Sequence, residues 1–244
     1  MTLDEAIELA NQGDAFTMGS IGHYYYEKND YQNAFEWFAK AADAGLVDAM
    51  PPAASLALLL SITERSLSGW ESITDADVRT LDKAIEWDRL AQEAGFESDS
   101  TDDLYRERAL CAFEASKKDG SNISPLRAID YLKDAYARQN RTPEVEVCLA
   151  MALGRADPLT ADDARLRFDL LKHCVSFSEE DVPDINIGTL EAALGMCYLR
   201  GKGCVIDENA AHDCFVRAEQ KGFDCSDMLR QFRKKLFGGY ALRR

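Results

Sequence analysis

Alanine and aromatic residues recur along the chain at the spacing of one helical face. In the first occurrence they are Ala34, Trp37, Phe38 and Ala41. Offsets of three, four and seven residues place these side chains on one stripe of a helix. Alanine lets a second helix approach closely, while the ring fills the groove beside it. The pattern predicts a helix that recurs every 36 to 50 residues, with leading alanines at Ala34, Ala84, Ala128, Ala164 and Ala211.

A second predicted helix precedes each stripe. The clearest examples are residues 21–25 and 194–198, which share the order apolar residue, glycine, two residues, tyrosine. A glycine followed three residues later by a ring suits two closely crossed helices. We therefore expect about five antiparallel helix pairs between residues 15 and 222. The fourth pair, 144–175, is the least regular, because Arg167 stands where a ring is usual.

The two ends of the chain carry their own signals. Residues 2–5 read as a capped helix start, which predicts an N-terminal capping helix over 2–13. A last helix over about 226–237, followed by two glycines, is expected to form a C-terminal cap within 224–239. No segment has several short alternating strands. The expected fold is all-α, a single solenoid domain over 1–244 in which each pair contacts mainly its neighbours.

These patterns resemble known helical repeats. The first pair looks like a tetratricopeptide repeat, through Gly22, Tyr25, Ala34, Phe38 and Ala41. The fifth is similar to a close relative, the Sel-one-like repeat (SLR), whose mark is the glycine-bearing loop found here at 201–207, followed by a helix cap matched by Asp207. The resemblance implies a right-handed α-solenoid. It also implies a non-catalytic scaffold or adaptor that binds another protein or peptide in a concave groove.

The resemblance also selects candidate groove residues. In the tetratricopeptide register, the positions one, four and five residues after the small residue of each first helix face the groove. Aromatic, histidine and methionine side chains on such a wall suit an extended peptide or a partner helix. Phe113 and Leu199 could instead belong to the core, and so could His23. The candidates are His23, Tyr26, Glu27, Phe113, Ser116, Lys117, Met196, Leu199 and Arg200.

Charge suggests an alternative function. The net charge of −15 is uneven, since residues 1–122 hold 24 acidic and 10 basic side chains and residues 123–244 hold 19 and 18. The segment 71–103 has 11 acidic residues against three basic ones. Such a field repels nucleic acid and attracts a basic partner. The alternative to the adaptor is therefore an inhibitor or immunity-type protein that masks a basic or nucleic-acid-binding surface. The plainer interpretation is a solvated surface.

Candidate chemistry is sparse. Seven cysteines, without a paired motif or an export signal, indicate reduced thiols, and no apolar run is long enough to span a membrane. We therefore expect a cytoplasmic adaptor, of bacterial origin, that binds neither a membrane nor nucleic acid directly. Cys204, His212 and Cys214 could form a metal site, but their irregular spacing favours a core interpretation, so no metal or cofactor is expected. No catalytic motif is present, and an enzyme or ligand sensor is the third hypothesis.

Overall fold

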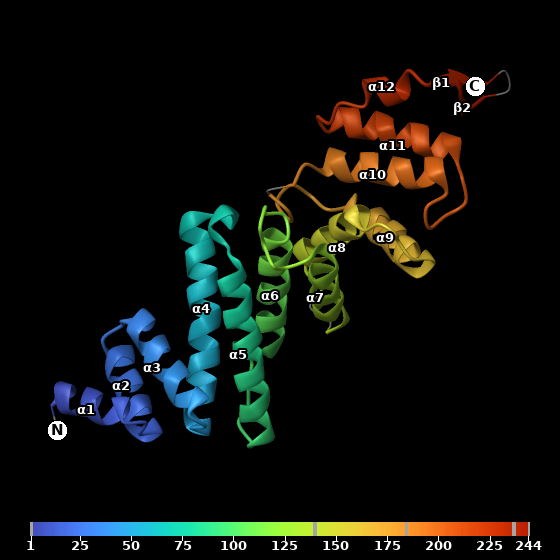
Figure 1. Ribbon diagram of the computed structural model, residues 1–244. Coiled ribbons are helices and arrows are strands. Elements are labelled where there is room, and N and C mark those ends of the chain that lie inside the picture. Colours follow the sequence, from blue (N-terminus) through green and yellow to red (C-terminus); the bar gives the residue numbers. More distant parts are fainter. Residues whose placement is uncertain (1, 139–140, 184, 236–237, 244) are drawn as a thin grey trace. The chain divides into compact units, whose positions relative to one another are not determined.

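The computed structural model describes residues 2–138, 141–183, 185–235 and 238–243 (Figure 1). The chain divides into two compact units, residues 1–140 and 141–244. Within each unit, helices that follow one another in sequence pack against each other as pairs. The predicted helix pairs are therefore confirmed. The sequence pattern contains no sign of the division into units.

The first unit contains a leading helix and three pairs. The leading helix, α1, spans Leu3–Asn11. Two short 3₁₀ turns, Val47–Ala49 and Trp70–Ser72, lie before and after α4. The pairs are α2 (Ala15–Glu27) with α3 (Tyr31–Asp43), α4 (Met50–Ser68) with α5 (Asp75–Glu93), and α6 (Thr101–Ala115) with α7 (Pro125–Ala137).

The second unit contains two pairs and a C-terminal extension. The extension consists of the short helix α12 (Ser226–Leu229) and an antiparallel hairpin of β1 (Phe232–Lys234) and β2 (Tyr240–Leu242). The pairs are α8 (Pro143–Arg155) with α9 (Ala161–Cys174), and α10 (Ile187–Arg200) with α11 (Glu208–Gln220).

The alanines of the repeated stripe are buried, and in the first and fifth pairs the aromatic ring between them packs on a glycine of the preceding helix. A Cβ atom at Gly22 would come within 2.8 Å of the Phe38 ring, so α2 and α3 can pack this closely only if the position has no side chain. Phe215 lies over Gly195 in the same way, where a Cβ would be 2.9 Å from the ring. These contacts confirm the predicted close crossing of helices in the first and fifth pairs. The buried leading alanines are Ala34, Ala84, Ala128 and Ala211.

The fourth pair is a regular helix pair despite its unusual sequence. Leu171 is buried at the position where other pairs have alanine. The guanidinium group of Arg167 lies against Gly154 of α8, where a Cβ would be 2.9 Å from Nη2. A cation therefore occupies space that the first and fifth pairs give to a ring, and glycine again makes the room.

A buried ion pair joins α4 to α6. The side chain of Glu107 is 0% exposed and accepts two hydrogen bonds from Arg65, at 3.2 Å from Nε and 3.1 Å from Nη2. The Ser61 hydroxyl donates a third, at 3.1 Å. Because a carboxylate without such partners is costly inside a protein, these bonds fix how the second and third pairs meet.

Side-chain caps begin most of the predicted helices. Thr2 and Glu5 form a reciprocal capping box at the start of α1, as expected. Asp207 accepts hydrogen bonds from two backbone amides at the start of α11. Asp75, the first residue of α5, also accepts hydrogen bonds from the Ser121 hydroxyl and the Asn122 amide, each at 2.6 Å. These bonds, the Ser121 bond foremost, favour the charged form and lower the pKa of Asp75.

The N-terminal capping helix is present, whereas the prediction of a helix as the C-terminal cap is wrong. Ala6 and Ala10 of α1 pack against the buried Ile21 and Trp37, so α1 covers the end of the first core. At the other end the predicted helix over 226–237 stops at Leu229, and a β-hairpin follows. Residues 236 and 237 of that prediction lie outside the described residues.

Aromatic packing explains the hairpin. The Tyr240 ring stacks on His212 of α11 with centroids 3.4 Å apart, and the buried Phe232 meets both His212 and Phe215. Gly239, with a φ of +79°, adopts a conformation that suits a turn and not a helix. The hairpin therefore places two rings on the last core, which a straight helix over the same residues would not bring together.

Candidate protein-binding surface on α2

Three of the predicted groove residues lie together on α2. The exposed side chains of His23, Tyr26 and Glu27 share a helix face with Phe16, Gly19 and Ser20, because these positions are separated by three, four or seven residues. We call these six residues the α2 stripe. The Phe16 side chain is 72% exposed and the Tyr26 side chain 49%. Large aromatic side chains this open to solvent on one helix face are typical of interaction surfaces.

A pocket of about 240 Å³ opens beside the α2 stripe. Its floor is Phe38, whose ring meets that of His23 edge to face, with centroids 4.9 Å apart. Gly19 forms part of the wall, and a Cβ there would lie 2.9 Å from Leu46 Cδ2. The absence of a side chain at this position thus leaves the hollow open. The lining residues are Phe16, Gly19, Ser20, His23, Phe38, Leu46, Asp48 and Ala49.

The segment of the chain that forms this pocket is acidic. Residues 1–50 contain nine aspartates and glutamates and two lysines. Lys28 donates a hydrogen bond to Tyr24 and lies 4.0 Å above its ring, and Lys40 lies 4.2 Å above the ring of Trp37. Asp48 lines the pocket itself, and Glu27 ends the stripe. An approaching cation is therefore favoured at this surface.

The groove residues predicted in the third pair are not open to a partner in the same way. Phe113 is only 3% exposed and belongs to the core, so the groove assignment is wrong for this residue and the core alternative is the one that holds. Ser116 donates a hydrogen bond to the Phe113 carbonyl at 2.7 Å. Lys117 pairs with Glu114 and lies 4.8 Å above the Phe113 ring. The sequence pattern could not choose between groove and core for Phe113, because an apolar residue on a first helix can face either the groove or the next pair.

The groove residues predicted in the fifth pair lie in the second unit. Met196 and Leu199 are half-buried and pack against the core around Phe215 and Phe232. Arg200 is exposed at the last position of α10. Much of the apolar surface of this trio is therefore used for packing within its own unit.

Several carboxylates of the acidic segment 71–103 have hydrogen-bond or ion-pair partners within the chain. Asp82 forms ion pairs with Arg108 and Arg127, at 3.2 and 3.3 Å. The buried Asp88 accepts a hydrogen bond from Thr101 at 2.6 Å. Glu93 pairs with Arg89 at 2.5 Å. Because Asp82 is paired with two arginines from outside the segment, the segment presents less charge than its sequence suggests, and the masking hypothesis is not favoured.

The candidate metal site at Cys204, His212 and Cys214 is not formed in the part of the chain that the structure describes. His212 packs between the rings of Tyr240 and Phe232. Burial raises the pKa of Cys214 to about 11, so its thiol is neutral at physiological pH. Among the described residues, no group of three His, Cys, Asp or Glu side chains is placed to hold a metal ion.

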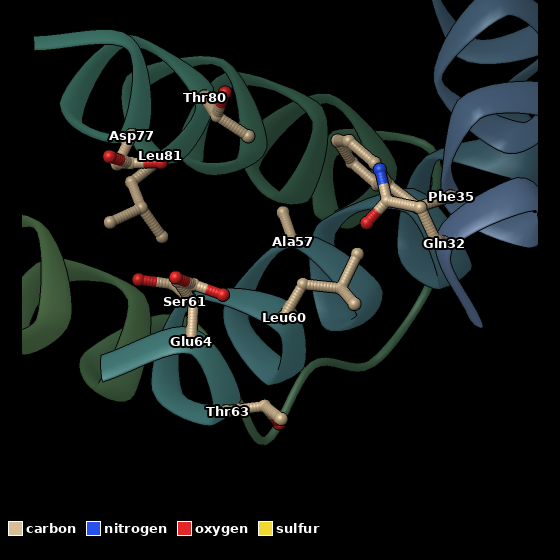
Figure 2. A pocket seen from close by; sticks show the side chains of 10 residues that line it. All are labelled: Gln32, Phe35, Ala57, Leu60, Ser61, Thr63, Glu64, Asp77, Thr80 and Leu81. Carbon is tan, nitrogen blue, oxygen red and sulfur yellow. The ribbon is translucent and has the colours of Figure 1, made fainter. Parts of the chain in front are cut away.

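The structure contains a second hollow in the first unit that the sequence patterns missed (Figure 2). It measures about 300 Å³ and lies between α3, α4 and α5. Since α4 and α5 have 19 residues and α3 has 13, the longer helices continue past the end of their neighbour. The only sequence signal was the long interval between the first two alanine stripes. The labelled lining residues include Phe35, Leu60, Ser61, Glu64, Asp77 and Thr80.

Comparisons with known proteins give the fold context. No protein-family model matches the chain, and no curated protein matches it. The Sel1 repeat protein from Oxalobacter formigenes is a similar solved structure, with 17% identity, a TM-score of 0.32 and coverage of 90% of this chain and 77% of that chain. Another is c5321, a protective antigen present in uropathogenic Escherichia coli strains that displays an SLR fold. It has 16% identity and a TM-score of 0.26, and the match covers 86% of this chain and 54% of that chain.

Both structures belong to the repeat class that the sequence resembles. Because their TM-scores are below 0.5, we assign the fold from the helix pairs themselves. The chain is an α-helical repeat protein. In the part of it that the structure describes, no helix has the length and apolar character needed to cross a membrane.

Proposed function

We propose that this protein is a non-catalytic adaptor that binds a segment of another protein on the α2 stripe. The observation that carries the proposal is the strongly exposed Phe16 beside the pocket floored by Phe38. An aromatic residue that folding leaves in water, next to a hollow with an apolar floor, gains apolar burial when a partner covers it. The burial of such aromatic anchors dominates the energy of many interfaces.

The pocket and its charge define the chemistry of the partner segment. A cavity of about 240 Å³ has room for a large apolar side chain. Asp48 at the pocket and Glu27 at the end of the stripe favour lysine or arginine next to that anchor. The proposed partner is therefore a basic segment with an aromatic or aliphatic anchor. A segment of this kind would bind through apolar burial and gain association rate from charge.

Variants of the stripe, with a matched control, test the proposal. The full chain, Phe16→Ala and His23→Ala are used for affinity capture from the host, together with Leu126→Ala, which removes a 64% exposed apolar side chain from α7. A synthetic peptide of the captured segment is then titrated against each variant. Both stripe substitutions are expected to weaken binding at least tenfold, about 1.4 kcal/mol each. Leu126→Ala is expected to bind like the unaltered chain.

Gly19→Ala separates binding from folding. The added methyl group narrows the pocket wall beside Leu46 but suits a helix better than glycine does. This variant is expected to be at least as stable as the unaltered chain and to bind the peptide more weakly. Undiminished binding by Phe16→Ala, His23→Ala and Gly19→Ala would refute the proposed surface. A loss of binding in Leu126→Ala equal to that in the stripe variants would also contradict it.

A further inference from the structure

Arg167 is an unusual residue within the helical repeat. Three residues after the leading alanine, the first three pairs carry Trp37, Trp87 and Tyr131, whereas the fourth carries this arginine. Arg167 is half-buried, and its guanidinium group lies against Gly154. The second unit therefore places a permanent positive charge where three other pairs place an aromatic ring.

The charge of Arg167 is not balanced by a carboxylate among the described residues. Its Nε donates a hydrogen bond to the Ala150 carbonyl at 3.2 Å, and its Nη1 donates one to Cys197 Sγ at 3.4 Å. Burial raises the pKa of Cys197, so the sulfur is a neutral thiol. Both acceptors are thus uncharged. Of the five N–H groups of a guanidinium, three remain without a described protein acceptor.

A cavity of about 200 Å³ adjoins this guanidinium group. It is formed by α8, α9 and α10, all in the second unit. Leu171, Leu190 and Ala193 give it apolar walls, and Thr189 adds a hydroxyl group. An ion pair formed in apolar surroundings is stronger than one in open water, because the effective dielectric constant is lower. The remaining lining residues are Ala150, Met151, Gly154 and Arg155.

We propose that this cavity binds a carboxylate on a short aliphatic body, with the carboxylate paired to Arg167. The planar guanidinium group matches the two oxygens of a carboxylate, and the single charges of the two groups balance. The apolar walls suit the methylene groups that follow the carboxylate. A free aliphatic acid and an acidic side chain of a partner both have this chemistry. The site lies wholly within the second unit and is independent of the α2 stripe.

Arginine side-chain NMR on the full chain tests the site directly. The Nε–Hε signal of Arg167 is assigned in ¹⁵N-arginine-labelled protein by its loss in Arg167→Gln. Butanoate is expected to shift this signal saturably, whereas butanamide, which has the same body without the charge, is expected to leave it in place. An equal shift with butanamide, or no saturable shift with butanoate, would overturn the proposal. The titration itself uses the unaltered chain, and the variant serves only to assign the signal.

Thermal stabilisation by the same probes compares a variant of the site with a variant of an exposed arginine outside it. Arg167→Gln is expected to weaken the apparent affinity for butanoate at least tenfold, while Arg165→Gln, which alters an exposed arginine on the same helix, is expected to leave it unchanged. Equal stabilisation by inorganic phosphate, or full stabilisation of Arg167→Gln, would overturn the proposal. A capped glutamate, N-acetyl-Glu-N-methylamide, distinguishes a free aliphatic acid from an acidic side chain of a partner as the source of the carboxylate. Tighter binding than butanoate supports an acidic side chain as the ligand, and weaker binding supports a free acid.

Discussion

The packing of Phe38 on Gly22 makes a quantitative prediction about two glycines in one helix. Gly22→Ala adds a methyl group within 2.8 to 2.9 Å of three ring carbons of Phe38. The ring is 1% exposed and cannot move away without disturbing the core. Such overpacking costs about 1–3 kcal/mol. Replacing a helical glycine by alanine returns about 1 kcal/mol, so the expected net loss is about 1 kcal/mol.

Gly19→Ala, one turn earlier in α2, is the matched control. Its added methyl group meets only Cδ2 of Leu46, the end of a flexible side chain that can rotate away. The helix-propensity gain should therefore dominate, and the variant should be stabilised by up to about 1 kcal/mol. The two alanine variants should thus differ in their free energy of unfolding by about 2 kcal/mol, with opposite signs relative to the unaltered chain.

Tryptophan fluorescence during urea unfolding reports on the first compact unit, which contains both glycines. All three tryptophans, Trp37, Trp70 and Trp87, lie within residues 1–140. With slopes of about 1–3 kcal/mol per molar urea, a 1 kcal/mol loss lowers the midpoint by roughly 0.3–1 M. Phe38→Leu in the Gly22→Ala background should relieve the clash, giving a non-additive double-mutant cycle. The reasoning is refuted if Gly22→Ala is as stable as Gly19→Ala.

Three further substitutions test other contacts. Glu107→Ala leaves Arg65 without its buried partner and should lower the free energy of unfolding by about 3–5 kcal/mol in the same urea assay; a loss below 1 kcal/mol would contradict this. Gly203→Ala should lower the melting temperature of the second unit by circular dichroism, because a Cβ would overlap the Ala164 carbonyl and the φ of +79° disfavours alanine. Asp75→Asn should reduce stability at neutral pH, and its deficit should disappear in acid. The folded pKa of Asp75 is lowered, so its contribution is complete above the unfolded pKa and lost as pH falls through the folded one. A deficit that stays constant from pH 7 to about pH 2 would exclude that role.

Part of the candidate surface followed from the sequence because it lies on one helix. His23, Tyr26 and Glu27 face solvent together, since positions three or four residues apart share a face. The pocket beside them could not be predicted in this way. It requires Leu46 and Asp48, which lie beyond the next helix, and Phe38, which reaches it across the helix pair. The burial of Phe113 likewise depends on what packs against α6.

Local periodicity determined the repeated helix pairs, the buried alanines and the glycines under Phe38 and Phe215, because helical spacing fixes which side chains share a face. Tertiary structure alone decided which charged side chains find partners and which structure the C-terminal residues adopt. Carboxylates of 71–103 find partners from other helices, and Arg167 meets a cavity instead of a carboxylate among the described residues. The C-terminal residues form a hairpin because the surface around His212 offers stacking to Tyr240. These outcomes depend on residues that are distant in sequence, and no local pattern encodes which of them meet.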